Sequence, residues 1–300
     1  VMVNDVRRAY FYAKTHRDIY IELPAEDLEG DKDMLGKLNP SLYGTRDAAS
    51  NWQEHLSRQL EAIGFVRGVG HPSVFHHPGH GLVTLVHGDD YTTAGEPKEL
   101  QWFKKELEGA YEIKTQLIGP EGTETGKVLN RVITYVGDGY ELEADQRHSE
   151  MIAEQLGVTG SGGITTAGCQ NEEIETPEQE EDLPAGDVTL FRGVAARANY
   201  LGPDRPDMLY ASKEVCREMS KPSVAGLDKI TRIAKFLSGR PRVVWEVPNQ
   251  EFQDVIDVYV DANWAGCRRT RKSTSGGCAM LGKHCLKAWS KTQSIIAKSS

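Results

Sequence analysis

Two periodicities alternate along the first part of the chain. Residues 18–23 alternate between polar and apolar side chains and stop at Pro24, which predicts a strand. Apolar residues then recur every three or four positions, which predicts a helix that starts at Thr45 or Asp47 and ends at Gly64. The residues that carry this helical spacing are Trp52, Leu56, Leu60 and Ile63.

The apolar runs that follow are shorter and favour strands. Val74–His76 and Leu82–His87 are β-prone runs joined through a segment rich in Gly and Pro. After residues 88–90 the β-prone pattern resumes at Tyr91, so we expect a hairpin there. A helix then starts at Pro97, and its apolar face consists of Leu100, Phe103 and Leu107.

Strands and helices are mixed up to about residue 145, the pattern is mostly helical from there to residue 240, and it is then strand-led again. Val128–Tyr135 and Tyr140–Leu142 predict a hairpin, and residues 158–187, rich in Gly, Thr and Glu, predict a linker. A strand over Val255–Val260 opens a last segment of different charge. Helices are predicted over Arg147–Leu156, Arg205–Met219 and Val224–Leu237.

The composition describes a globular chain whose charge is unevenly distributed. Three hundred residues, 39% of them hydrophobic, suffice for two or three domains, and no stretch approaches the roughly 18 apolar residues of a membrane span. The net charge is −9, yet residues 171–187 hold eight acids and no base, whereas residues 261–300 hold eight Lys or Arg against one acid. The basic last segment suits a polyanionic partner, or an ordinary solvated face.

The cysteines indicate a reducing environment. The chain has five of them, an odd number, and they are widely spaced. Such a pattern is not a disulfide framework, so we expect free thiols in an intracellular setting. Cys278, His284 and Cys285 allow a zinc site, but without a CxxC pair buried thiols fit the spacing better.

Asp89 and Asp90 lie side by side at the turn of the predicted hairpin. Two carboxylates this close repel each other, and each raises the pKa of the other unless a cation lies beside them. Mg²⁺ is the usual cation, because it prefers oxygen ligands, commonly one or two carboxylates together with substrate phosphates. By itself the pair is more typical of a solvated β-turn than of a metal site.

A metal site for phosphoryl transfer needs a further carboxylate from another segment, because it holds two ions about 3.5–4 Å apart. Asp5, which apolar and aromatic residues follow, is the candidate on a neighbouring strand.

At these positions the sequence resembles the copia-like retrotransposon reverse transcriptases. Asp5-Val6-x-x-Ala9-Tyr10 resembles the first carboxylate motif of their polymerase. Residues 41–48, with Trp52, are similar to the family's Ser-Leu-Tyr-Gly-Leu-Lys-Gln-Ala segment and the Trp that follows it. His87-Gly88-Asp89-Asp90 stands where the family has Tyr-Val-Asp-Asp.

The resemblance continues, in order, across nearly the whole chain. Residues 191–193 and 205–207 are similar to the family's Tyr-Arg-x-x-x-Gly and Thr-Arg-Pro-Asp motifs. Residues 259–266, 271–276 and 288–293 resemble the opening of the ribonuclease H domain that follows the polymerase in that family. Because the ordered set is far more specific than any one motif, the chain is identified as part of an RNA-directed DNA polymerase of this type.

The resemblance implies the metal ligands and the partners. Asp5 and Asp89 would bind two Mg²⁺ (or Mn²⁺) ions, with Asp90 beside them as the third acidic member, and the backbone carbonyl of Val6 would add a ligand. The partners would be an RNA or DNA template–primer and deoxynucleoside triphosphates, with no membrane. The expected setting is then a cytoplasmic particle or the nucleus.

The resemblance also implies two nucleotide-binding positions. Tyr10 would lie beneath the sugar of the incoming nucleotide and exclude a 2′ hydroxyl by bulk; its alternative is a core aromatic on a strand. Gly44 would let the backbone approach the template–nucleotide pair closely, which a residue without a β carbon does best. Its alternative is a plain turn at the entry of a helix.

The implied fold class is α+β, in three parts. Residues 1–120 would form a polymerase palm, an antiparallel sheet backed by helices, without the fingers. Residues 121–240 would form a helical thumb or connection that contains the acidic linker 158–187. Residues 251–300 would form a truncated ribonuclease H segment of α/β type.

In that last segment Asp261 would be the first metal carboxylate of ribonuclease H. The expected companion carboxylates do not follow before Ser300, so we expect the nuclease to be incomplete. A set of basic residues near Asp261 is a candidate for phosphate contacts, although a solvated loop explains them equally well. These residues are Arg268, Arg269, Arg271 and Lys272.

Both ends of the chain are typical of an internal fragment of a polyprotein, since only four residues precede Asp5. We therefore expect the chain by itself to have little or no polymerase activity. The alternative is a catalytically inactive remnant of an element that at most binds nucleic acid. The altered pair His87-Gly88 allows that alternative, whereas the retained Asp5, Asp89 and Asp90 favour the enzyme.

Overall fold

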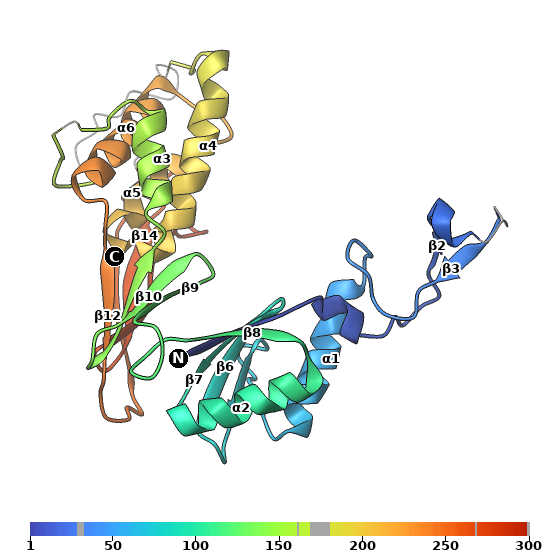
Figure 1. The fold of residues 1–300 in the computed structure, drawn as a ribbon. Helices are drawn as coiled ribbons and strands as arrows, with labels where there is room; N and C mark the ends of the chain where they lie inside the picture. The colour runs from blue at the N-terminus through green and yellow to red at the C-terminus, as the bar shows by residue number, and fades with distance from the viewer. Residues whose placement is uncertain (29–32, 161, 169–180, 268, 299–300) are drawn as a thin grey trace. The chain divides into compact units, whose positions relative to one another are not determined.

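The chain folds as two compact units, Val1–Val128 and Leu129–Ser300, each with its own hydrophobic core. Antiparallel sheets and helices make up both units, which agrees with the predicted α+β class (Figure 1). Among the described residues, none of the helices has the length and apolar character to cross a membrane. The computed structural model describes residues 1–28, 33–160, 162–168, 181–267 and 269–298.

A six-stranded antiparallel sheet forms the centre of the first unit. Its strand order is β4-β5-β6-β7-β1-β8, so the N-terminal strand β1 lies between two strands from much later in the sequence. The strands are β1 (Met2–Val6), β4 (Val66–Arg67), β5 (Val74–His77), β6 (Leu82–His87), β7 (Asp90–Ala94) and β8 (Ile113–Leu117).

Two helices, α1 (Ala48–Ala62) and α2 (Pro97–Ala110), pack on one face of this sheet. Leu82 and Val86 of β6 are buried in the core that the helices share with the sheet, whereas Val83 points to the other face and is exposed. The predicted helical spacing is confirmed, because the residues that carry it lie in this core. Each such side chain stabilises the fold by about 1.5–3 kcal/mol when it leaves water. The helical residues in this core are Trp52, Leu56, Leu60, Leu100, Phe103 and Leu107.

The predicted end of α1 is also confirmed. Gly64 has φ +100°, its N–H donates to the Glu61 carbonyl, and the Phe65 N–H donates to the Leu60 carbonyl, as at a glycine-terminated helix. A β carbon at Gly64 would lie 2.7 Å from Nε2 of His77. Backbone conformation and space therefore both require glycine there, and the chain returns to the core at Phe65.

The rest of the first unit consists of short elements. The strand predicted over residues 18–23 is present as β2 (Tyr20–Glu22), which pairs antiparallel with β3 (Leu35–Lys37). The other short elements are the 3₁₀ turns η1 (Ala9–Tyr12) and η2 (Ala25–Asp27) and the strand β9 (Thr125–Val128).

The described residues of the second unit form four α-helices and two groups of strands. The helices share one core, and Figure 1 shows them gathered together. They are α3 (Arg147–Gln155), α4 (Ala185–Leu201), α5 (Leu209–Cys216) and α6 (Val224–Gly239). The strands of the first group are β10 (Arg131–Tyr135), β11 (Gly139–Ala144) and β12 (Val244–Pro248), and those of the second are β13 (Ile256–Asn263), β14 (Thr274–Leu281) and β15 (His284–Thr292).

The helix α4 corrects the expectation of a linker up to residue 187. It starts at Ala185 and packs Phe191, Val194 and Ala198 into the core, at the spacing of a helical face. That spacing is visible in the sequence, but Gly186 and Gly193 weaken it because glycine lowers helix propensity. Residues 161 and 169–180 of the predicted linker lie outside the described residues.

The helix predicted over Arg205–Met219 is interrupted at its start. It is replaced by two 3₁₀ turns, η3 (Gly202–Asp204) and η4 (Pro206–Met208), and by the shorter α5. Proline disfavours the helical conformation for the residue before it, so Arg205 cannot lie inside a regular helix. The helix predicted over Val224–Leu237 is confirmed as α6.

Arg205 is the buried polar centre of the second unit. Only 1% of it is exposed, and its guanidinium donates to both carboxylate oxygens of Asp207 at 3.0 and 2.9 Å. It also donates to the carbonyl oxygens of Arg240 and Pro241 at 2.8 and 3.1 Å. The motif Arg205-Pro206-Asp207 thus ties η4 to the end of α6, which is a structural role.

Candidate active site

The pairing of β1 with β7 brings three carboxylates together. In this register Asp5 lies opposite Asp90, and Asp89 occupies the turn just before β7. One oxygen of each of Asp5, Asp89 and Asp90 lies within 4.8 Å of the others. In the part of the chain that the structure describes, these are the only three or more His, Cys, Asp or Glu side chains so placed.

The turn that carries Asp89 has two residues. His87 pairs with Asp90 across the hairpin, so Gly88 and Asp89 are its central positions. Gly88 has φ +64°, whereas Asp89 is absent from the described residues with positive φ. This is the pattern of a type II′ turn, which takes glycine first and whose twist matches a β-hairpin. The glycine that departs from the family pattern therefore fits the local backbone.

Two hydrogen bonds hold this turn. The Val6 N–H donates to the carbonyl oxygen of Asp89 at 3.0 Å, continuing the ladder from β1. The indole Nε1 of Trp52, in α1, donates to the carbonyl oxygen of Gly88 at 2.7 Å. Trp52 itself is 1% exposed. A strand and a helix therefore fix the turn from separate directions.

The cluster concentrates negative charge at one end of the sheet. None of the ion pairs found among the described residues involves Asp5, Asp89 or Asp90. Partial burial raises the pKa of Asp90, and the charges of Asp89 and Asp5 add to the effect, while His87 opposes it. The predicted mutual repulsion of the carboxylates is therefore present at Asp90.

The three oxygens fit a small hard cation. Two oxygens on opposite sides of a Mg²⁺ ion lie roughly 4.2 Å apart, twice the metal–oxygen distance. Oxygens within 4.8 Å of one another approach that span without movement of the strands. Asp5 is exposed and the other two are half-buried, so one side of the cluster is open to solvent and to a substrate.

A pair of tyrosines lies beside the cluster. The rings of Tyr10 and Tyr43 are stacked at a tilt, with centroids 4.4 Å apart. Burial raises the pKa of the Tyr43 hydroxyl, and the charges of Asp89 and Asp5 raise it further, so this hydroxyl lies within their field. Tyr10 is half-buried, which leaves part of its ring accessible.

Gly44 follows Tyr43 directly and has φ +89°. A β carbon there would meet nothing within 4 Å, so the requirement for glycine comes from the backbone conformation, and open space lies over it.

The predicted ribonuclease H position does not join such a cluster. Asp261 is exposed on β13, opposite Gly276 of β14, and belongs to no group of three metal-binding side chains among the described residues. Arg269 and Arg271 are exposed in the loop after β13, and Lys272 is half-buried. Arg268 lies outside the described residues.

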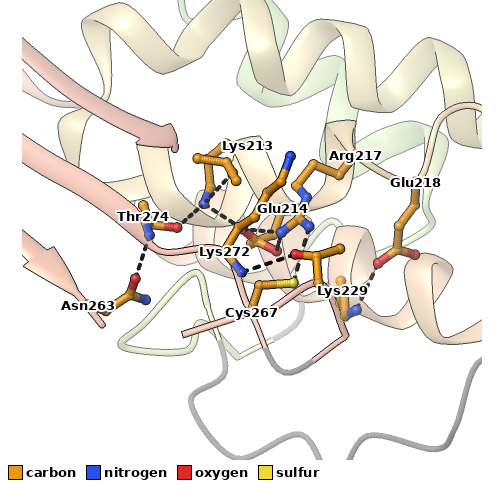
Figure 2. A network of polar contacts seen from close by, with 11 residues as sticks. Lys213, Glu214, Arg217, Glu218, Lys229, Asn263, Cys267, Lys272 and Thr274 are labelled. Carbon is orange, nitrogen blue, oxygen red and sulfur yellow. Dashed lines mark hydrogen bonds and ion pairs between the residues drawn. The ribbon is translucent and has the colours of Figure 1, made fainter. Parts of the chain in front are cut away.

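The same loop makes a polar network with α5 (Figure 2). Lys213 donates to the hydroxyl of Thr274 at 2.7 Å, and Arg217 donates to Sγ of Cys267 at 3.2 Å. Burial acts to raise the pKa of the Cys267 thiol, but hydrogen bonds from Thr270 and Arg217 outweigh it and lower that pKa to about 7. Lys272 accepts at its backbone carbonyl from the Cys267 N–H. The network fixes the loop that carries the basic residues.

The thiols of the second unit agree with the expected absence of disulfides. Four cysteines in the described residues are free, namely Cys216, Cys267, Cys278 and Cys285. The zinc alternative is not supported, since His284 bonds Gln250 and the Pro248 carbonyl.

No role in the site was predicted for Trp52 or Tyr43, although both lie in the matched segment of residues 41–52 and Trp52 was placed on the apolar face of its helix. Their contacts to the aspartate turn and to Tyr10 come from folding α1 and its approach against distant strands. Two features of the sequence could have pointed to them. Tyr43 directly precedes Gly44, and Trp52 brings an indole N–H to the otherwise apolar face of its helix.

Comparison with known proteins assigns the chain to a family. Residues 1–166 match the family of reverse transcriptases (RNA-dependent DNA polymerases). This match covers more than half of the chain, and the chain belongs to that family. The family predicted from the sequence motifs is confirmed.

Individual relatives are polyproteins of transposons. The chain is 27% and 24% identical to the retrovirus-related Pol polyproteins from transposons RE1 and RE2 of Arabidopsis thaliana, over 99% of its length and 20% of theirs. It is 22% identical to the Pol polyprotein from transposon TNT 1-94 of Nicotiana tabacum, over 99% of its length and 22% of that protein. The chain thus spans about a fifth of these relatives.

Proposed function

We propose that this chain is the polymerase palm and the adjoining thumb-like region of a retrotransposon Pol polyprotein. It acts in RNA-directed DNA synthesis by two-metal nucleotidyl transfer. The observation that carries the proposal is the convergence of Asp5, from one strand, with Asp89 and Asp90, from a hairpin, in a member of the reverse transcriptase family.

In this proposal Asp5 and Asp89 hold Mg²⁺, and Asp90 adds negative charge beside them. Mg²⁺ bound there supplies a Lewis acid that neutralises charge on the triphosphate and makes the primer 3′ hydroxyl more acidic. The protein's own part is to keep three like charges together: the β1–β7 register sets their spacing, and the core beneath the sheet holds that register. Such pre-organisation is the usual source of catalysis in phosphoryl transfer.

The nucleotide side of the proposal involves Tyr10 and Gly44. The Tyr10 ring would exclude a 2′ hydroxyl by bulk, and its stacking on Tyr43, whose hydroxyl lies in the field of Asp89 and Asp5, supports this role. The backbone at Gly44 has open space over it, which suits close approach of a base pair.

The second unit enters the proposal more generally. Its helices would act as the thumb, and the segment with Asp261 would begin ribonuclease H. The exposed Arg269 and Arg271, together with Lys272, would contact phosphates of the template–primer. The setting would be a cytoplasmic particle or the nucleus.

The test is single-turnover addition of one deoxynucleotide to an RNA–DNA template–primer, with the chain in excess and Mg²⁺ present, because this format detects even the small activity expected of the chain by itself. Asp89→Asn keeps the shape of the side chain but removes its charge, and we expect the rate to fall by roughly 100-fold or more, as for other lost electrostatic contacts at reacting groups.

The matched control is Asp138→Asn, at the exposed turn between β10 and β11. It should leave the rate unchanged. Addition at an equal rate by Asp89→Asn and by the unaltered chain would contradict the proposal, as would a folded chain that neither adds nucleotide nor binds Mn²⁺.

A further inference from the structure

We propose that Trp52 is a positioning residue for the Asp89 carboxylate: its indole N–H fixes the orientation of the peptide plane between Gly88 and Asp89. The expected effect of Trp52 on metal binding rests on the function proposed above. The expected effect of Trp52 on the conformation of the turn does not depend on that function.

The peptide in question is the central one of the hairpin turn. Turn types I′ and II′ differ mainly in the rotation of this plane, which changes ψ of the first central residue and φ of the second. A flip to type I′ would give Asp89 a positive φ and would re-aim its side chain. The carbonyl oxygen of Gly88 belongs to this plane, so whatever binds that oxygen selects the turn type.

The sequence of the turn does not select strongly by itself. Glycine has no β carbon and permits both rotations at Gly88. Aspartate is among the few residues that tolerate the left-handed region. The turn therefore needs an external contact to keep Asp89 directed at Asp5.

Trp52 supplies this contact from a rigid position. Its ring packs against those of His55 and Tyr111, with centroids 5.7 and 5.3 Å away, and its Nε1 lies 2.7 Å from the Gly88 oxygen. A flip of the peptide would leave the buried indole N–H without its acceptor, which is unfavourable because a buried donor then loses its hydrogen bond.

The other peptide plane of Asp89 is already fixed. Its carbonyl oxygen accepts from the Val6 N–H at 3.0 Å, as part of the sheet. With both planes held, the Cα–Cβ direction of Asp89 is set. Trp52 thus controls the one rotation that the sheet leaves free.

The experiment removes the donor and keeps the ring. Trp52→Phe deletes the N–H together with part of the ring, and replacement of Trp52 by benzothienylalanine deletes only the N–H, because sulfur takes the place of nitrogen. The control is Trp102→Phe, at a tryptophan of the same unit whose ring stacks on His80 at 3.7 Å.

Two readouts are needed on the full chain: the Mn²⁺ dissociation constant, and the amide–amide NOE between Gly88 and Asp89, which is weak in a type II′ turn and strong after the flip. We expect both Trp52 replacements to weaken Mn²⁺ binding roughly 2- to 10-fold, the equivalent of one hydrogen bond, and to strengthen the NOE. Trp102→Phe should change neither readout.

The outcomes separate the two proposals. An unchanged NOE in the benzothienylalanine protein would overturn the role of Trp52, and so would unchanged Mn²⁺ affinity when Asp89→Asn abolishes binding. If the unaltered chain does not bind Mn²⁺, the proposed function fails and the NOE alone decides about Trp52. If Trp52→Phe does not fold, the isosteric replacement decides.

Discussion

Two hairpins of this protein place a Gly-Asp pair at their tips, and only one of them builds a site. In the first unit Gly88-Asp89 joins β6 to β7, and in the second unit Gly137-Asp138 lies between β10 and β11. Both glycines have positive φ, +64° and +85°, and both of their carbonyls accept a side-chain hydrogen bond.

The difference lies in what surrounds each tip. The donor to Gly137 is Tyr135, from the same hairpin, and Asp138 is exposed. The donor to Gly88 is Trp52, a buried residue of α1, and the neighbouring strand β1 contributes Asp5 beside the turn. A Gly-Asp turn is therefore a local solution to chain reversal, and here it becomes part of a charged site because the next residue and a distant strand each add a carboxylate.

The largest expected effect comes from removing that distant carboxylate. Asp5→Asn leaves the turn unchanged but should weaken Mn²⁺ binding by roughly 100-fold or more, since even the outer partners of metal ligands change affinity by 10–100-fold. Titration followed by electron paramagnetic resonance of free Mn²⁺ measures this. Asp138→Asn should bind as the unaltered chain does, and equal loss in both variants would mean that binding is not specific to the cluster.

A smaller effect tests the two turns against each other. Gly88→Ala and Gly137→Ala each force a β carbon into positive φ, and neither β carbon meets an atom within 4 Å. Each should destabilise its own unit by about 1–2 kcal/mol. Urea unfolding followed by NMR signals from each core measures this, and only Gly88→Ala should also change Mn²⁺ affinity. A change of Mn²⁺ affinity in Gly137→Ala would contradict the claim that only the Gly88 turn belongs to the metal site.

The smallest effect concerns pH. Because burial and the neighbouring carboxylates raise the pKa of Asp90, its charged form is disfavoured in the folded chain. The group therefore contributes stability below its unfolded pKa of about 3.9 and loses it as the pH rises through the folded value. Without metal, Asp90→Asn should unfold at a higher temperature than the unaltered chain at pH 7, and the gap should close toward pH 4. A gap in unfolding temperature that widens at low pH would contradict a raised pKa of Asp90.

Much of the first unit follows from the sequence, because its elements are strongly periodic. The spacing of Trp52, Leu56 and Leu60 and the turn residue Gly64 place α1 almost to the residue. Asp89 and Asp90 were predicted as adjacent carboxylates at a turn, and Asp5 as a candidate on a neighbouring strand. The motif resemblance was needed to join the three, since nothing local links Asp5 to Asp89.

What the sequence did not reveal depends on long-range contacts. The bond from Trp52 to Gly88 and the stacking of Tyr43 on Tyr10 require the register of distant segments. Arg205 was recognised as part of a motif, but its burial depends on carbonyls at the end of α6. The helix α4 was missed because its two glycines and the acidic stretch before it favour a loop.

The central claim is that Asp5 and Asp89 hold the same metal ion. A double-mutant cycle on Mn²⁺ affinity tests it most directly, with Asp5→Asn, Asp89→Asn and the two combined, because coupling is expected only between groups that share a partner. We predict strong non-additivity: each single variant loses the site, and the double variant binds no more weakly than either. Losses that simply add, or single variants that bind like the unaltered chain, would contradict the account.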